Sequence, residues 1–368
     1  MKKNKALKIS LGILALSVAF AGALAFSGCN KKAQKPKQKP KVENVVTPQP
    51  EPEEEKPQFF SRLTGLPVKE STTKKRPIAV MIENTKACQP HYGINKAGIV
   101  YECPVEGGIT REMGIFENYS GLKRFGNVRS CRPYYVYIAK EFDAVYVHFG
   151  QSTQGKQLLA TGIVDDLNGL DGSISSSVFY RTSDKAAPHN AYTSTEGIKK
   201  GMKMKNFATK IKSETPSHFT FADEEYTPEG KDAQVICPYF FDNKPYFIYD
   251  SSSGKYARYE FSAPEKDAVD GKQVKVKNII FQNVPSSTYE GGLKLNIPLT
   301  GKGKGTYFTK GKMVPVTWKK DSDKSITHYY TEDGKELKVN PGKTWVCLIQ
   351  ESQAAKNRIY ATVKESGY

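Results

Sequence analysis

Helix-like and strand-like segments are unevenly distributed along this chain of 368 residues. Between about residues 76 and 206, short apolar runs alternate with segments of helical periodicity, which is typical of a layered α/β domain. After about residue 213 the helical pattern stops, and short β-branched and aromatic runs follow one another, separated by turns such as DNK, SSSG and EDGK. The sequence therefore predicts an α/β, sandwich-like part with a mixed sheet, followed by a mainly-β part.

Individual elements can be placed from their patterns. Strands are expected at PIAVMIEN, GIVYECPV, REMGIFENY, AVYVHFG and SSVFYR, and helices at RPYYVYIAKEF (with Pro133 in the first turn), KQLLATGIVDDLNG and STEGIKKGMKMKNF. Two glycine-containing segments, NPGKT (340–344) and GKGKG (301–305), have features of phosphate-binding loops. Because strands and not helices follow them, we expect a turn and a flexible hairpin instead.

The first 28 residues have the features of an export signal. Four lysines in MKKNKALK precede the apolar stretch ISLGILALSVAFAGALAF, and small residues follow it. The run FSGC at 26–29 resembles a bacterial lipobox, with Phe26 where Leu is usual, which would make Cys29 the lipidated first residue of the mature protein. The alternative is an uncleaved membrane anchor. Either interpretation puts the rest of the chain on the extracytoplasmic side of the cell membrane.

Shifts in composition divide the chain into five segments. Residues 29–60 are rich in Pro, Lys and Glu and have little to bury, so they are expected to form a disordered tether. The complete prediction is a signal peptide at 1–28, the tether at 29–60, an α/β domain at 61–212, a mainly-β domain at 213–358 and a tail at 359–368.

Charge and cysteine content narrow the classes of partner and site. The formal charge is +17, and the four lysines of the signal leave +13 on the mature chain. Outside the membrane such a charge can meet lipid headgroups, anionic wall polymers and cell-wall peptides, but not nucleic acid; it can equally be scattered solubilising charge. Without Cys29, five cysteines remain, with no CxxC pair, and the five histidines form no HxH or HExxH pair. We therefore expect no cofactor, no sequence-local metal site and no complete disulfide framework.

Several longer segments resemble one family. RPIAVMIEN, VYECPVEGGITRE, GNVRSCRPYYVYIAKEFDAVYVHFGQS and APHNAYTS occur in the same order in the YerB-like bacterial lipoproteins, and VTWKK…YYTEDGKELKVNPGKTWVCLI is similar to their second domain. The resemblance covers about residues 60–355. It implies an α/β sandwich-like domain followed by a smaller β domain. It implies little about activity, because the biochemical role of that family is not settled.

Polar side chains collect at the ends of the predicted strands and helices in the α/β part. Because such ends tend to gather at one edge of a sheet, we expect a ligand-binding pocket there. The candidate residues are Glu106, Arg111, Arg129, Arg132, His148, His189 and Asn190. Guanidinium and imidazole groups would hold an anion by charge-assisted hydrogen bonds. The same groups could instead perform acid–base chemistry, with Glu106 orienting a histidine.

Most of these residues also have a structural explanation. Glu106 and Arg111 could form an ion pair across the GGIT turn, and Arg129 could cap backbone carbonyls. His148 could be a core histidine with its hydrogen bonds satisfied. His189 could be a turn residue whose ring bonds a neighbouring backbone group.

The sequence leads to one functional hypothesis and two alternatives. The hypothesis is an extracytoplasmic protein, anchored to the cell membrane by a lipid on Cys29, that binds an anionic or polar envelope ligand such as a wall polymer or peptidoglycan. The first alternative is a metal-independent hydrolase or transferase acting on an envelope glycan or phosphodiester, with His148 and His189 as the acid–base pair. The second is a module that binds another envelope protein through edge strands.

Overall fold

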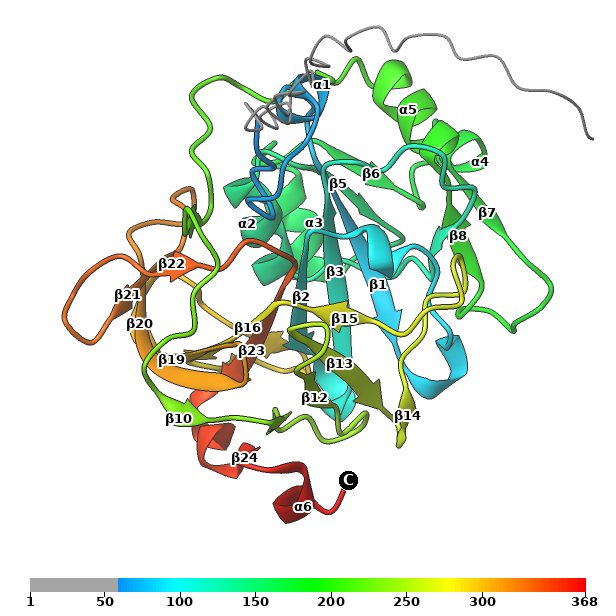
Figure 1. Ribbon diagram of the computed structural model, residues 1–368. Helices are drawn as coiled ribbons and strands as arrows, with labels where there is room; N and C mark the ends of the chain where they lie inside the picture. The colour runs from blue at the N-terminus through cyan, green and yellow to red at the C-terminus, as the bar shows by residue number, and fades with distance from the viewer. Residues whose placement is uncertain (1–58) are drawn as a thin grey trace, which may run out of the picture. The chain divides into compact units, whose positions relative to one another are not determined.

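A mixed sheet of eleven strands runs through both parts of the chain (Figure 1). The computed structural model describes residues 59–368, so the predicted signal peptide, Cys29 and nearly all of the tether lie outside the described residues. In order across the sheet, the strands are β10 (Lys231–Asp232), β20 (Lys312–Lys320), β19 (Gly301–Thr309), β16 (Asn278–Val284), β23 (Thr344–Gln350), β2 (Ile99–Pro104), β3 (Thr110–Phe116), β1 (Ile78–Asn84), β5 (Val145–His148) and β6 (Asp166–Asn168), with β21 (His328–Thr331) paired to β20.

Strand β23 joins the two parts of this sheet. It is parallel both to β2 and to β16, while β1 is antiparallel to β3 and parallel to β5. The predicted fold class, an α/β part with a mixed sheet followed by a mainly-β part, is confirmed. The predicted domain boundaries stay a prediction, and strands from both sides of residue 212 belong to the one large sheet.

Smaller sheets complete the β structure of residues 59–368. The largest has six strands, β14 (Ala263–Pro264), β13 (Lys255–Glu260), β12 (Tyr246–Asp250), β11 (Val235–Cys237) and β24 (Arg358–Tyr360), with β15 (Lys275–Val276) beside β13. The others are β4 (Phe125–Gly126), β8 (Ala191–Thr193) and β7 (Phe179–Arg181); β17 (Ser287–Thr288) and β18 (Leu295–Asn296); and β22 (Lys338–Val339) and β9 (Thr220–Phe221).

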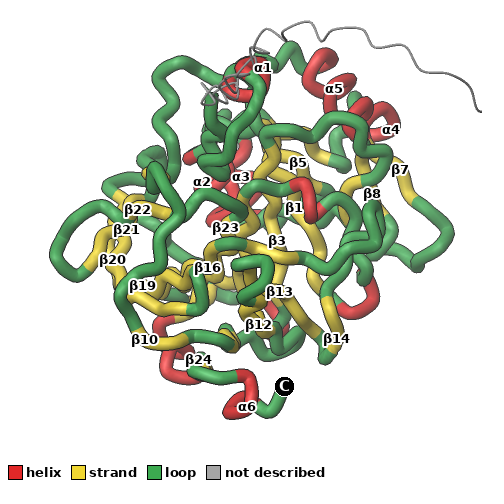
Figure 2. Tube along the Cα trace, viewed as in Figure 1, coloured by secondary structure: helices red, strands yellow, loops and turns green. Residues whose placement is uncertain are grey.

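The helices are short and lie around the strands (Figure 2). The α-helices are α1 (Glu70–Thr73), α2 (Pro133–Glu141), α3 (Thr153–Leu159), α4 (Ser175–Val178), α5 (Thr195–Met204) and α6 (Val363–Ser366). The 3₁₀ helices are η1 (Lys86–Cys88), η2 (Ile94–Lys96), η3 (Glu106–Gly108) and η4 (Glu351–Lys356). None of the helices in the described part of the chain is long and apolar enough to cross a membrane.

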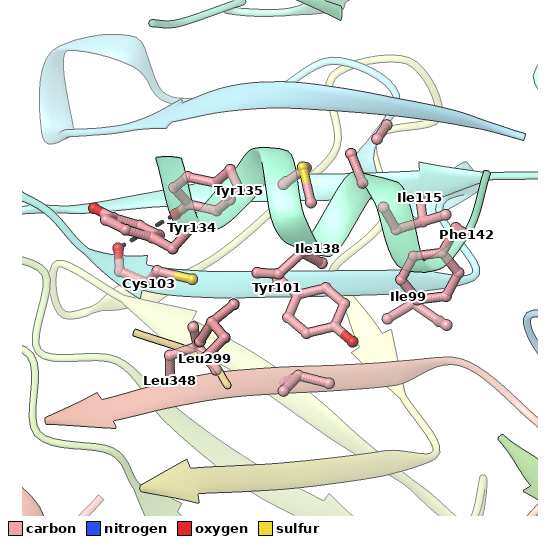
Figure 3. Close-up of a cluster of buried hydrophobic side chains, with 14 of the residues drawn as sticks. Ile99, Tyr101, Cys103, Ile115, Tyr134, Tyr135, Ile138, Phe142, Leu299 and Leu348 are labelled. Carbon is pink, nitrogen blue, oxygen red and sulfur yellow. Dashed lines mark hydrogen bonds between the residues drawn. The ribbon is translucent and has the colours of Figure 1, made fainter. Parts of the chain in front are cut away.

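The large sheet buries apolar side chains on both faces. On one face, Tyr101 and Cys103 of β2 pack against α2. Figure 3 shows these two side chains next to Tyr135 and Ile138 of the helix. On the other face, Phe247 of β12 meets Trp345 of β23 edge to face, with ring centroids 5.9 Å apart. Because side chains alternate along a strand, each strand near the middle of the sheet contributes to both cores.

The two predicted helices with clear start signals form as expected. Helix α2 begins at Pro133, directly after the extended residue Arg132; proline suits this position because the first helical N–H has no partner inside the helix. Helix α5 is capped by the side chain of Ser194, which accepts a hydrogen bond from the backbone N–H of Gly197.

Two helix and strand predictions hold only in part. The segment KQLLATGIVDDLNG was expected to be helical throughout, but α3 ends at Leu159 and the later residues form β6, which pairs in parallel with β5. Between them, Gly162 has a positive φ of 69°, which ends the helical conformation. The segment SSVFYR begins as the short helix α4 before it becomes β7.

The glycine-rich segment GKGKG is not a flexible hairpin but the first half of β19. A Cβ atom on Gly303 would lie 2.5 Å from Nε1 of Trp318, and one on Gly305 would lie 2.6 Å from the carbonyl oxygen of Phe281. The glycines therefore allow close approach between strands. The NPGKT segment is a turn that leads into β23, as predicted.

The cysteines of the described chain behave as small apolar residues. Cys88, Cys103, Cys131, Cys237 and Cys347 are all free, and all except Cys237 are buried. No disulfide bond joins any of the cysteines among residues 59–368.

Candidate functional site

The first candidate site forms where β1 and β3 lie side by side. Glu83 and Arg111 are directly opposite each other in this antiparallel pair, so their side chains share one face of the sheet. Nη1 of Arg111 donates a hydrogen bond to the carbonyl oxygen of Ser130 at 2.7 Å. Its Nε is buried and has no hydrogen-bond partner among the described residues. Arg111 is therefore a largely buried guanidinium with an unused donor.

The carboxylate of Glu83 contacts two further candidate residues, Arg129 and His189. Nδ1 of His189 lies 2.8 Å from Oε1 of Glu83, and Nε of Arg129 lies 3.3 Å from the same oxygen. The Glu83 side chain is 2% exposed, whereas those of Arg129 and His189 are 24% and 28% exposed. Arg129 and His189 therefore form the solvent-accessible edge of the site, and the carboxylate that orients them lies beneath.

Glu106 is paired with Arg132 and not with Arg111. Nε of Arg132 donates to Oε2 of Glu106 at 2.9 Å, its Nη2 donates to Oε1, and Nζ of Lys294 lies 3.3 Å from Oε1. Burial raises the pKa of Glu106, but the hydrogen bonds and charge of Arg132 outweigh it and lower that pKa to about 2. The structural alternative of a Glu106–Arg111 pair is thus replaced by a bidentate pair with Arg132.

We call Glu83, Glu106, Arg111, Arg129, Arg132 and His189 the arginine cluster. Within it, burial lowers the pKa of Arg111, and the positive charge of Arg132 lowers it further, to about 10. The charge of Arg129 acts in the same direction. Arg129 and Arg132 are therefore both close enough to Arg111 to repel its charge, and the carboxylate of Glu106 partly offsets them.

His148 and Asn190 have partners outside the arginine cluster. Nδ1 of His148 lies 2.8 Å from the carbonyl oxygen of Gly150, and its Nε2 lies 3.0 Å from Oδ2 of Asp166. The ring is fully buried and stacks on Tyr146, so the structural explanation of His148 as a satisfied core histidine fits these contacts.

Asn190 bonds within its own loop. Its Oδ1 accepts from Nη1 of Arg181 at 2.7 Å, and its Nδ2 donates to the carbonyl oxygen of Thr182 at 2.7 Å. The structure thus brings five of the seven predicted residues together and adds Glu83. The one sequence signal for Glu83 is a carboxylate near the end of the otherwise apolar strand PIAVMIEN.

A second polar cluster lies on the opposite face of the same strands. We call His91, Glu102, Glu112, Arg258, Glu260 and Glu265 the buried acidic cluster; all six are at most 2% exposed. The guanidinium of Arg258 lies among the carboxylates, 2.9 Å from Glu102, 3.4 Å from Glu112 and 3.1 Å from Glu260, and it also contacts Glu265. This cluster joins β2 and β3 to β13 and the residues that follow it.

The carboxylates of this cluster differ in how well they are bonded. Glu102 accepts hydrogen bonds from Asn84, Thr110, Asn243 and Trp345 as well as from Arg258. Both carboxylate oxygens of Glu112 are buried and accept no hydrogen bond from the described residues. Burial and the neighbouring charge of Glu265 raise the pKa of Glu112.

One group in this cluster has donor atoms suited to a metal ion. His91, Glu112, Glu260 and Glu265 each offer one donor atom, and these atoms all lie within 4.8 Å of one another. The sequence did not indicate this group, because its members are separated by up to 174 positions and form no local motif.

Two of the cavities among the described residues bear on the location of a ligand site. One of about 310 Å³ adjoins Glu106 and is lined by η3, Phe241, Leu293 and Gln353. A larger one, of about 700 Å³, lies in the mainly-β part beside Lys302, Lys304, Trp318 and Tyr330. Only the smaller cavity touches a residue of the arginine cluster.

Comparison with known proteins identifies relatives for nearly all of the described chain. Residues 63–208 match the family model described as the N-terminal domain of a protein of unknown function (DUF3048), and residues 235–346 match the model of its C-terminal domain. The chain is 33% identical over 296 residues to "Putative lipoprotein YerB" of Bacillus subtilis (strain 168), which covers 80% of this chain and 87% of that protein.

A solved structure agrees with the sequence comparison. The crystal structure of the YerB protein from Bacillus subtilis matches with a TM-score of 0.73 and 30% identity, over 82% of this chain and all of that chain. The resemblance to the YerB-like proteins is confirmed, and both halves of the fold are shared. The chain belongs to the DUF3048 family and contains both its N-terminal and its C-terminal domain.

Proposed function

We propose that this protein is a lipid-anchored, extracytoplasmic protein that binds an anionic cell-envelope ligand through its arginine cluster. The FSGC run at 26–29 supports lipid attachment at Cys29, and the Bacillus subtilis relative carries the word lipoprotein in its name. An anchor there would hold residues 59–368 close to the membrane surface, among anionic wall polymers and peptidoglycan.

The observation that carries the proposal is the excess of guanidiniums at the arginine cluster. Among residues 59–368, Arg111, Arg129 and Arg132 are accompanied by two carboxylates, Glu83 and Glu106. Nε of Arg111 has no partner among the described residues. An anionic group would compensate the remaining positive charge and accept hydrogen bonds from the guanidiniums, which suit phosphate and carboxylate geometry.

The accessible edge of the cluster indicates where a ligand would first make contact. Arg129 and His189 are partly exposed, and both are held by the buried Glu83 carboxylate. A ligand anion beside them would meet side chains that are already oriented, which lowers the entropy cost of binding. Polymers with repeated phosphate or carboxylate groups suit such a site, because each chain offers many equivalent anions.

Binding can be tested with the full-length protein in detergent. Titration with a polyglycerol phosphate polymer, inorganic phosphate and a neutral glucan would be followed by calorimetry and by the thermal unfolding midpoint. We expect saturable binding of the phosphate-containing probes and none of the glucan. Arg129→Gln should weaken binding about 10- to 100-fold, the effect of losing one charge-assisted hydrogen bond.

Arg358→Gln is the matched control for Arg129→Gln. Arg358 is exposed, and its Nη1 donates only to the backbone carbonyls of Ala355 and Asn357. Arg358→Gln removes the same charge from a side chain that, among the described residues, forms no ion pair or hydrogen bond with the arginine cluster, so it should leave affinity within about twofold of wild type. Absence of binding, or equal losses in the two variants, would refute the assignment of the arginine cluster as an anion site.

Anchoring is tested separately in cells. Cys29→Ser should abolish incorporation of a labelled fatty acid and move the protein from the membrane fraction to the medium or a soluble fraction. Replacement of Cys237, which is free and only partly buried, is the control and should change neither. A Cys29→Ser protein that is still lipid-labelled would contradict lipid attachment at this position.

The catalytic alternative rests on a specific contact, the pair formed by His189 and Glu83. A histidine oriented by a buried carboxylate beside arginines has the arrangement of a general acid–base group. Turnover of an envelope phosphodiester or glycan that disappears in His189→Gln and persists in His148→Gln would favour an enzyme. Both ring nitrogens of His148 already have partners, so His148 is not expected to act as the second proton-transfer group.

A further inference from the structure

We propose that the buried acidic cluster binds one divalent transition-metal ion through Nδ1 of His91 and one oxygen each of Glu112, Glu260 and Glu265. These four donor atoms lie within 4.8 Å of one another, which places them around a single point. The proposal concerns the face of the sheet opposite the arginine cluster and does not depend on anion binding there.

Charge balance in the cluster calls for a cation. When all four are ionised, Glu102, Glu112, Glu260 and Glu265 carry four negative charges against the one positive charge of Arg258, which leaves −3, or −2 when His91 is protonated. All of these side chains are almost completely buried. Uncompensated buried charge is costly, so it is normally neutralised by protons or by a bound cation.

The orientation of His91 fits metal ligation. Its Nε2 lies 2.7 Å from the backbone carbonyl oxygen of Glu83, which can only accept a hydrogen bond, so Nε2 carries a proton. Nδ1 lies 3.0 Å from Oε1 of Glu265 and 3.3 Å from Oε2 of Glu112, so without a metal it holds a proton between these oxygens, and a metal ion bound there would take the place of that proton. A second ring nitrogen that donates to a carbonyl is the usual support of a metal-binding histidine.

The carboxylate of Glu112 gives a further reason to expect a cation here. Its two oxygens are buried, accept no hydrogen bond from the described residues, and face His91 and Arg258. Glu102, its direct cross-strand partner, has hydrogen bonds to both of its oxygens. The free acceptor positions of Glu112 are therefore left on the side where the other three donors meet.

The donor set selects the class of metal. Carboxylate oxygens suit Mg²⁺, Ca²⁺ and Mn²⁺, whereas imidazole suits Zn²⁺ and other first-row transition ions. Three carboxylates with one imidazole are compatible with Mn²⁺ first and Zn²⁺ second. Because the cluster is closed to solvent, the ion would enter during folding and would link β3 of the N-terminal part to the segment around β13 of the C-terminal part.

Metal content and refolding together test the proposal. The full-length protein, purified in detergent without chelator, should contain about one equivalent of metal by mass spectrometry. After denaturation with EDTA, wild-type protein refolded with Mn²⁺ or Zn²⁺ should unfold at a higher temperature than protein refolded without metal. Mg²⁺ and Ca²⁺ should give a smaller increase.

Glu112→Gln is the informative variant, because it keeps the shape of the side chain and removes its charge. It should fold with at least tenfold lower metal occupancy and without the metal-dependent rise in unfolding temperature. The control, Glu336→Gln, changes an exposed carboxylate 3.1 Å from Nδ1 of His328 and should retain full occupancy.

Two results would overturn the proposal. The first is wild-type protein that is metal-free as purified and refolds to the same unfolding temperature with or without Mn²⁺ and Zn²⁺, which would mean that protons neutralise the cluster. The second is a Glu112→Gln protein with unchanged metal occupancy. The refolding comparison needs no variant, so it remains decisive if Glu112→Gln does not fold.

Discussion

Arg111 and Glu112 are consecutive residues of β3, yet their side chains enter different polar clusters on opposite faces of the large sheet. Arg111 lies opposite Glu83 in the arginine cluster, and Glu112 lies with His91 and Arg258 in the buried acidic cluster. The alternation of side chains along the strand causes this separation. Two neighbouring residues of one strand therefore belong to a cluster with excess positive charge on one face and to a cluster with excess negative charge on the other.

Glu83 connects the two clusters from β1. Its side chain binds Arg129 and His189, while its backbone carbonyl accepts the hydrogen bond from Nε2 of His91. A change in the position of β1 at this residue would therefore reach both clusters.

Replacement of Glu83 by Gln should destabilise the fold. The variant removes the charge that pairs with Arg129 and His189, and we expect a loss of about 1–3 kcal/mol because the carboxylate is buried while its partners are partly exposed. Urea unfolding monitored by circular dichroism measures this loss. The matched change in an exposed His–Glu pair, Glu336→Gln, should cost less than about 0.5 kcal/mol. Similar losses in the two variants would contradict the importance of the Glu83 contacts.

His218 should make the protein less stable in mild acid. Burial, followed by the positive charges of Lys320 and His328, lowers its pKa to about 3. The unfolded chain, with an ordinary histidine pKa near 6.5, binds more protons than the folded one between these values. The free energy of unfolding should therefore fall as the pH decreases from about 6.5 towards 3, by up to about 1.4 kcal/mol per pH unit from this group.

The measurement is the pH dependence of urea unfolding in wild type and His218→Gln, and the difference between the two isolates this histidine. Tyr101 and Glu141 also face the ring, at 3.0 and 3.3 Å. Burial raises the pKa of Glu141, so that its titration opposes the effect of His218 in both proteins. Parallel pH profiles would show that His218 does not carry the predicted effect.

Gly342→Ala should destabilise the turn before β23. Gly342 has a φ of 144°, and a Cβ atom there would lie 2.5 Å from Cβ of Lys277. The backbone N–H of Gly342 also donates to the carbonyl oxygen of Thr64 at 2.7 Å, so the turn cannot move freely. We expect a loss of about 1–3 kcal/mol by thermal or urea unfolding. The control is Gly334→Ala. Gly334 also has a positive φ, but no atom lies within 4 Å of the added Cβ, so this substitution should lower the free energy of unfolding by less.

Local patterns predicted most elements, and the exceptions have clear causes. Strands β1, β2 and β3 and helices α2 and α5 have strong periodicity or capping signals. The second half of KQLLATGIVDDLNG became β6 because pairing with β5 outweighs its helical pattern. GKGKG became part of β19 because its glycines fit against Trp318 and Phe281, a fit that depends on strands elsewhere in the chain.

For the candidate site, too, the sequence identified residues but not the long-range contacts that they make. Arg111, Arg129, Arg132, Glu106 and His189 could be selected because charged residues at strand and helix ends stand out in a sequence. Their partners could not be selected. The bond between His189 and Glu83 spans 106 residues, and Glu106 pairs with Arg132 although Arg111 is closer in the sequence. Ion pairing depends on distance in space, which sequence spacing does not report.

The sequence by itself determined the family, through the order of the segments that resemble it. It also determined the α/β-then-β order and which residue types gather at element ends, because these follow from local periodicity and turn chemistry. The tertiary structure alone decided that β23 unites the two parts in one sheet, and that His91 and Glu112 meet Glu260 and Glu265. Those contacts are long-range: each requires a register between strands that is set by packing of the whole sheet, so no local pattern carries it.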